Sequence, residues 1–128
     1  MSLSIVTNTP LKKPPADYCA PEDARWFEIP GGKDSGKTMF CYDIQVGTDE
    51  PEATVVLVHG NPETSYTYRR IRDALIESNK PVRIIAMDHI GFGLSDQADF
   101  EMVDMHHSDN LLQLIRHLDL TEVTLAVH

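Results

Sequence analysis

The sequence has little of several things that mark specialised classes of protein. Only 2 of its 128 residues are cysteines, too few for a disulfide scaffold, which indicates reduced thiols and a cytoplasmic location. Its longest apolar run, residues 55–58, is far too short to cross a bilayer, so we expect no membrane segment. Basic residues are scarce, since 11 lysines and arginines face 20 acids for a net charge of -9, which argues against a nucleic-acid partner.

What is present is the composition of a globular domain, with 41% hydrophobic and 24% charged residues. Residues 1–25 carry four prolines and no periodicity, and we interpret them as an extended lead-in. A strand is expected at residues 26–29, followed by a Pro-Gly-Gly turn. Residues 40–46 place apolar side chains at alternate positions, which is typical of a half-buried strand. The two strands predict a β-hairpin.

Beyond residue 52 the pattern changes to that of a parallel sheet. Continuous apolar runs at residues 53–58, 82–87 and 123–127 indicate buried strands. Tyr68, Ile71 and Leu75 recur at helical spacing with arginines between them, and a second helix is expected around residues 111–118. The predicted fold class is therefore α/β, with an N-terminal β-hairpin followed by a βαβαβ parallel sheet.

The last predicted strand raises an expectation about the size of the domain. Residues 123–127 are apolar on both faces, yet no helix follows them to cover a face of the sheet. We therefore expect residues 26–128 to form the N-terminal part of a core domain that is incomplete without a following segment. The complementary C-terminal half of the same polypeptide is the expected partner.

One segment imitates a nucleotide-binding loop. Residues 31–38 match the P-loop pattern G-x-x-x-x-G-K-[ST], whose amides surround phosphate at the start of a helix. Here the segment leads into the alternating strand of residues 40–46, and no helix follows it. We interpret it as a glycine-rich hairpin turn, and we expect no cofactor.

Residues 59–62, His-Gly-Asn-Pro, follow a buried strand, where ligands bind in open α/β sheets. We expect structural roles for His59, which would hold this loop, and for Asp88, which would anchor the next one. The histidines of residues 106–117 are interpreted as part of a solvated helix face, so no metal site is expected.

At this point the sequence resembles a known family, the α/β-hydrolases of the haloalkane dehalogenase type. The resemblance rests on three motifs in order, namely residues 59–69 (HGNPETSYTYR), 87–96 (MDHIGFGLSD) and 118–128 (LDLTEVTLAVH). In that family the nucleophile, general base and supporting acid all follow the position of residue 128. The resemblance implies a hydrolase that cleaves the carbon–halogen bond of a haloalkane through an aspartyl ester and releases halide. The isolated chain is then expected to be inactive.

The resemblance also implies site residues. Asn61 stands where the family's halide-binding Asn does, so it is the expected catalytic donor, with Pro62 and Glu63 beside it as substrate-binding residues. Glu63 is a departure, because the family usually has an uncharged residue there. A carboxylate that faced the pocket would repel halide, whereas one at the solvent side or the helix start would not.

Other readings remain open. An epoxide hydrolase or a β-lactone-cleaving relative would share the fold and the aspartate nucleophile, and a serine esterase would share the fold. A non-catalytic fragment that folds only with its complementary half is an alternative of another class. The residues after the last strand would discriminate among these readings.

Overall fold

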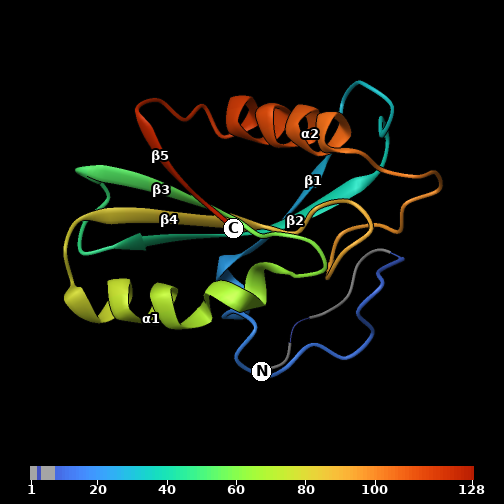
Figure 1. Ribbon diagram of the computed structural model, residues 1–128. Coiled ribbons are helices and arrows are strands. Elements are labelled where there is room, and N and C mark those ends of the chain that lie inside the picture. The colour runs from blue at the N-terminus through green and yellow to red at the C-terminus, as the bar shows by residue number, and fades with distance from the viewer. Residues whose placement is uncertain (1–2, 4–7) are drawn as a thin grey trace.

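The computed structural model describes residue 3 and residues 8–128, and one mixed β-sheet runs through it (Figure 1). Its five strands stand in the order β1-β2-β4-β3-β5. They are β1 (Ala24–Glu28), β2 (Thr38–Val46), β3 (Ala53–Val58), β4 (Val82–Met87) and β5 (Val123–Val127). The helices are α1 (Arg69–Ser78) and α2 (Asp104–His117), with short 3₁₀ turns η1 (Pro21–Asp23) and η2 (Ser65–Tyr68).

The predicted hairpin is present, but its second strand is buried more deeply than expected. β1 and β2 pair antiparallel, with Trp26 opposite Phe40, and β2 also pairs antiparallel with β4. Cys41, which the alternation placed on a solvent face, is 1% exposed, and Met39, just before the predicted run, is 0% exposed. The half-buried interpretation was therefore wrong for the first half of β2, because that half is covered on both faces, with Phe40 and Tyr42 in one apolar core and Cys41 in the other.

The βαβαβ prediction is confirmed. β3 pairs parallel with β4 on one side and with β5 on the other. After β3 the chain therefore crosses to one side, to form β4, and after β4 it crosses back past β3 to form β5. Since parallel crossovers share one hand, this reversal places the two helices on opposite faces. Figure 1 shows α1 below the sheet and α2 above it. The loops after β3 and β4 therefore diverge, which opens a crevice at the carboxyl ends of these two strands.

Each face of the sheet carries its own apolar core. Tyr42, Leu57 and Ile84 pack on the α1 face, together with Tyr68. Val56, Ile85, Met87 and Leu114 are among the residues that pack on the α2 face. The side chains of adjacent residues such as Val56 and Leu57 point to opposite faces, so a strand buried on both faces needs a continuous apolar run.

The lead-in contains no strand or helix before η1 among its described residues, yet it is packed against the core. Tyr18 and Cys19 are 1% and 4% exposed. Arg72 of α1 donates to the backbone oxygens of Asp17 and Tyr18 and is only 5% exposed, while Ile71 is 51% exposed. The predicted orientation of this helix was wrong at these two positions, because the lead-in covers the arginine-bearing side of α1.

β5 forms one edge of the sheet. The Leu125 and Val127 side chains point to the same face of the sheet as α2, and there they are 49% and 70% exposed. None of the helices in the described part of the chain is long and apolar enough to span a membrane.

Candidate functional site

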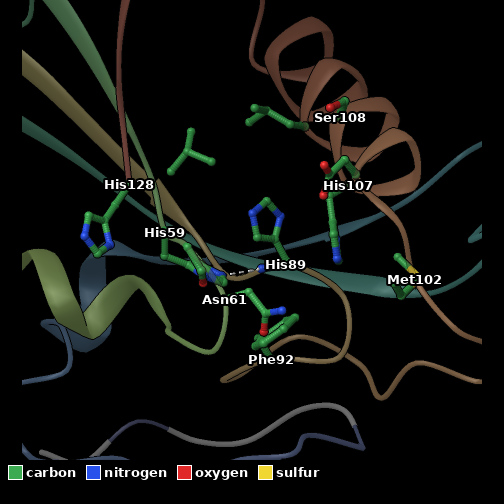
Figure 2. Close-up of a pocket in the computed structure, with 12 residues that line it drawn as sticks. His59, Asn61, His89, Phe92, Met102, His107, Ser108 and His128 are labelled. Atoms are coloured by element: carbon green, nitrogen blue, oxygen red, sulfur yellow. Dashed lines mark hydrogen bonds between the residues drawn. The ribbon is translucent and has the colours of Figure 1, made fainter.

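A cavity of about 330 Å³ opens in the crevice between the loops that follow β3 and β4. Its walls come from the end of β3 and the loop after it, the loop after β4, the first turns of α2 and the end of β5. Figure 2 shows this pocket with Asn61 and Phe92 on one side and the helix of His107 and Ser108 on another. It is the position at which ligands bind in open α/β sheets.

His59 fixes the start of the β3 loop. It is 2% exposed, and its Nε2 lies 2.9 Å from the backbone N–H of His89, from which it accepts. Its Nδ1 therefore carries the proton and donates to the Gly60 carbonyl at 2.8 Å. The predicted structural role is confirmed, with the addition that His59 joins the β3 loop to the β4 loop.

Asn61 lines the pocket and is exposed to it. Neither its side-chain amide nor its backbone N–H is hydrogen-bonded to another described residue. The peptide bond to Pro62 is cis. The site therefore presents two donor groups at Asn61, the side-chain NH2 and the backbone N–H, where a ligand with negative charge would be stabilised.

Pro62 and Glu63, the other two predicted site residues, are placed beside the pocket and are not part of its wall. Pro62 is exposed. The Glu63 carboxylate turns back to accept from the Gly60 N–H at 2.9 Å and from His128 Nδ1 at 2.8 Å. The hydrogen bond from His128 holds the pKa of the Glu63 carboxyl below its usual range, and the bond from Gly60 adds to this. The charge of Glu63 is thus directed to these two partners.

Asp88 anchors the β4 loop, as predicted. It is 0% exposed and accepts from the backbone N–H of Leu94 at 2.9 Å, from that of Ser65 at 2.7 Å and from the Tyr18 hydroxyl at 2.6 Å. These donors come from the β4 loop, from η2 and from the lead-in. A side chain at Gly93 (φ +54°) would collide with this carboxylate, so the turn requires glycine.

Two histidines in the pocket wall were not anticipated as site residues. The His89 ring lies between His59 and His107, with ring centroids 4.4 Å away in each case (Figure 2). Burial lowers the pKa of His89 to about 3, and the neighbouring His59 and His107 act in the same direction. Burial also lowers the pKa of His107. Both rings are therefore neutral near pH 7, and the Nδ1 of each is buried without a partner among the described residues.

The interpretation of His107 as part of a solvated helix face was wrong, because the first turn of α2 lies over the β4 loop. A helical pattern alone does not show which of two adjacent histidines faces the protein. Phe92, whose ring is 6.0 Å from that of His107, completes the group.

The segment that imitates a P-loop forms the turn between β1 and β2. Its Lys37 is engaged with Asp34 and Asp99, at 2.6 Å from each carboxylate. Asp34 is 1% exposed and also accepts from the Asn110 side chain of α2 at 2.8 Å. The lysine that would contact phosphate in a nucleotide site thus joins the hairpin turn to the β4 loop through Asp99, while Asp34 joins the turn to α2. Across residues 8–128 and residue 3, no group of three or more candidate ligands is arranged to hold a metal ion.

Comparison with known proteins identifies what this arrangement is similar to. Residues 53–128 match the alpha/beta hydrolase fold family. A cis-3-alkyl-4-alkyloxetan-2-one decarboxylase from Shewanella oneidensis is 39% identical over 89 residues, which are 66% of this chain and 26% of that protein. Haloalkane dehalogenase 2 from Mycobacterium tuberculosis is 30% identical over 101 residues, 78% of this chain and 31% of that protein.

Solved structures agree with the sequence relatives. The haloalkane dehalogenase DpaA from Paraglaciecola agarilytica matches with a TM-score of 0.70 at 31% identity, over 80% of this chain and 33% of that one. Epoxide hydrolase VrEH1 from Vigna radiata matches with a TM-score of 0.67 at 24% identity, over 86% and 32% of the two chains, which supports the fold alone. The chain thus spans between 26% and 33% of the length of these four proteins.

Proposed function

Because the chain belongs to the α/β-hydrolase fold family, of the haloalkane dehalogenase type, we propose that the protein carrying it is a hydrolase with its substrate pocket beside Asn61. In this proposal the nucleophile is an aspartate that follows β5, as the motif resemblance implies. A histidine base and its supporting acid come from further along the polypeptide. The residues of the described chain supply the donors and the walls of the pocket.

The single observation that carries the proposal is the state of Asn61. Its side-chain amide faces a cavity at the carboxyl ends of β3 and β4 and has no partner among the described residues. Because Asn61 is exposed, its amide can exchange a hydrogen bond to water for one to a ligand in the cavity. A donor left free in a pocket is suited to an anion that forms during a reaction.

The first candidate substrate is a haloalkane. The aspartate would attack the carbon that carries the halogen, so that a carbon–oxygen ester bond forms and the halide leaves with the bonding electrons. The Asn61 amide would donate to that halide, and its backbone N–H to the oxyanion formed when water hydrolyses the ester. The products are an alcohol, a halide ion and a proton.

A second candidate is a β-lactone, and two observations favour it. The relatives at 39% and 37% identity, from Shewanella oneidensis and Xanthomonas campestris, are cis-3-alkyl-4-alkyloxetan-2-one decarboxylases. The pocket wall also carries the neutral imidazoles of His89 and His107, which suit a substrate with a polar carbonyl better than a purely apolar haloalkane. Loss of CO₂ from a four-membered lactone leaves an alkene, so the atoms balance without a co-reactant.

The test compares substrates on the native polypeptide that contains residues 1–128. Halide release from 1-bromobutane supports the first candidate, whereas CO₂ and alkene from a cis-3,4-dialkyl oxetan-2-one support the second. Both activities should fall in Asn61→Ala, while Glu77→Gln, an exposed change on α1, should leave them intact. Conversion of an epoxide to a diol with neither other activity would overturn both candidates, as would full activity in Asn61→Ala.

A further inference from the structure

The β3 loop and the end of β5 touch at Gly60. The backbone N–H of His128 donates to the Val58 carbonyl at 3.2 Å, which continues the β3–β5 ladder past the strand ends. A Cβ at Gly60 would stand 2.7 Å from the His128 carbonyl oxygen, closer than side-chain atoms pack. Only glycine lets the two backbones approach this closely.

The Glu63 carboxylate bridges the same two segments. A single oxygen, Oε2, accepts from the Gly60 N–H at 2.9 Å and from His128 Nδ1 at 2.8 Å. The backbone supports this geometry, because the Glu63 N–H donates to the Gly60 carbonyl at 3.0 Å and closes a tight turn. Figure 2 shows the His128 side chain turned away from His89 and His107.

The bridge differs from the other contact that joins the two strands. The Tyr68 hydroxyl donates to the carbonyl oxygens of Val58 at 2.8 Å and Ala126 at 3.4 Å, and Tyr68 is 6% exposed. Tyr68 therefore ties the strand ends together inside the core. Glu63 instead connects the β3 loop to the end of β5, because its partners are Gly60, which precedes Asn61, and His128, which follows β5.

We propose that Glu63 is a positioning residue, which fixes the spacing between the donors of Asn61 and the backbone that leaves β5. This inference rests on the proposed function, in which the nucleophile follows β5 and Asn61 stabilises the leaving anion. A shift of about 1 Å between reacting groups costs up to ~10²-fold in rate, so a bridge between them affects turnover more than binding.

The charged and titratable groups around the bridge favour an ionised carboxylate. His128 is its direct partner, and His59 stands near enough to act in the same direction. The pKa of Glu63 is lowered chiefly by the hydrogen bond from His128, so the carboxylate stays ionised at neutral pH. Since a lowered carboxyl pKa means that protonation weakens the contact, the bridge is present at neutral pH and is lost as the pH falls through that pKa.

The test uses three variants of the native polypeptide. Glu63→Ala removes both hydrogen bonds, Glu63→Gln keeps an oxygen that accepts from Gly60 and His128, and Glu77→Gln removes an exposed acid on α1 as the control. We expect Glu63→Ala to lower kcat by about 10-fold with little change in KM, and Glu63→Gln to restore most of the loss. Equal losses in the two Glu63 variants, a loss confined to KM, or wild-type kcat in Glu63→Ala would overturn the proposal.

A second measurement is independent of any substrate. In ¹⁵N-labelled protein the Gly60 amide should exchange its hydrogen at least about 10-fold faster in Glu63→Ala than in the wild type, with slower exchange restored in Glu63→Gln. Unchanged Gly60 exchange in Glu63→Ala would overturn the bridge itself. If Gly60 responds as expected but none of the candidate substrates is turned over, the bridge stands and the proposed function fails.

Discussion

The two loops that meet at the pocket are held in opposite ways. The loop after β4 is built around a buried carboxylate, Asp88, whose three donors come from three different segments. The loop after β3 is held mainly through its backbone, at Gly60, and leaves the Asn61 side chain free in the pocket. One loop is thus a fixed support and the other presents a donor, and changes in the two should have different consequences.

The largest effect is expected from breaking the support. Asp88→Ala leaves the Tyr18 hydroxyl and two backbone N–H groups without an acceptor in a buried site, which should cost roughly 3 to 5 kcal/mol in the free energy of unfolding. Asp88→Asn keeps one oxygen and should cost less. Urea unfolding of the native polypeptide measures this, with the exposed Glu101→Gln as control. Equal stability of Asp88→Ala and the control would show that the β4 loop does not depend on Asp88.

The donor loop should show the reverse behaviour. Asn61→Ala should lower the rate of the chemical step by about 10²-fold, the usual loss when a preorganised donor to a developing anion is removed. The urea midpoint should stay near that of the wild type, because Asn61 makes no hydrogen bond with another described residue. Steady-state kinetics and unfolding on the same preparation separate the two outcomes. A lowered midpoint with an unchanged rate would reverse the roles assigned to the loops.

Gly60→Ala tests how closely the donor loop is fitted to β5. The added Cβ would meet the His128 carbonyl at 2.7 Å and the Glu63 carboxylate at 3.1 Å, so the loop must shift. We expect a loss of about 1 to 3 kcal/mol in the free energy of unfolding, as for other overpacked sites. Unlike Asn61→Ala, this variant should lose stability and rate together. A stable, fully active Gly60→Ala would mean that the contact with β5 is loose.

The sequence predicted the fold well because its signals are local. The runs at residues 53–58 and 82–87 are mostly apolar at successive positions, as strands covered on both faces require, whereas the similar run at residues 123–127 forms an edge strand with Leu125 and Val127 exposed. The family resemblance is confirmed by the matching family model and relatives. The side of a helix was harder to predict. Arg72 is buried because a segment of irregular structure, the lead-in, covers it, and no periodicity reports such a contact.

The candidate site was predicted in part, for a related reason. His59 and Asp88 follow strand ends, so their place in the fold followed from the strand pattern. His107 reaches the pocket only through the way α2 crosses the β4 loop, and the bond between Glu63 and His128 joins residues 65 positions apart. Such contacts depend on tertiary packing. The role of Asn61 stays a prediction, since its position in the pocket is known and its chemistry is untested.

His89 links the two loops, and its titration tests how closely they are packed. Its backbone N–H donates to His59, and its ring is held neutral by burial, with a pKa lowered from 6.5 to about 3. Between these two values the unfolded chain binds a proton at His89 that the folded chain does not. The stability that depends on neutral His89 is therefore complete above about pH 6.5 and falls as the pH drops toward 3, by at most ~1.4 kcal/mol per pH unit.

His89→Phe keeps an aromatic ring between the loops but removes this proton, so its unfolding free energy should fall less steeply below pH 6.5 than that of the wild type. Part of the slope should persist, because the lowered pKa of His107 acts with the same sign. Urea unfolding at pH 7, 6 and 5 gives the slopes, and Ser108→Ala, which changes a pocket residue without changing an ionisable group, should retain the wild-type slope. If His89→Phe also retains it, the His89 ring is open to protons in the folded state, and the two loops are less closely packed than the pocket geometry indicates.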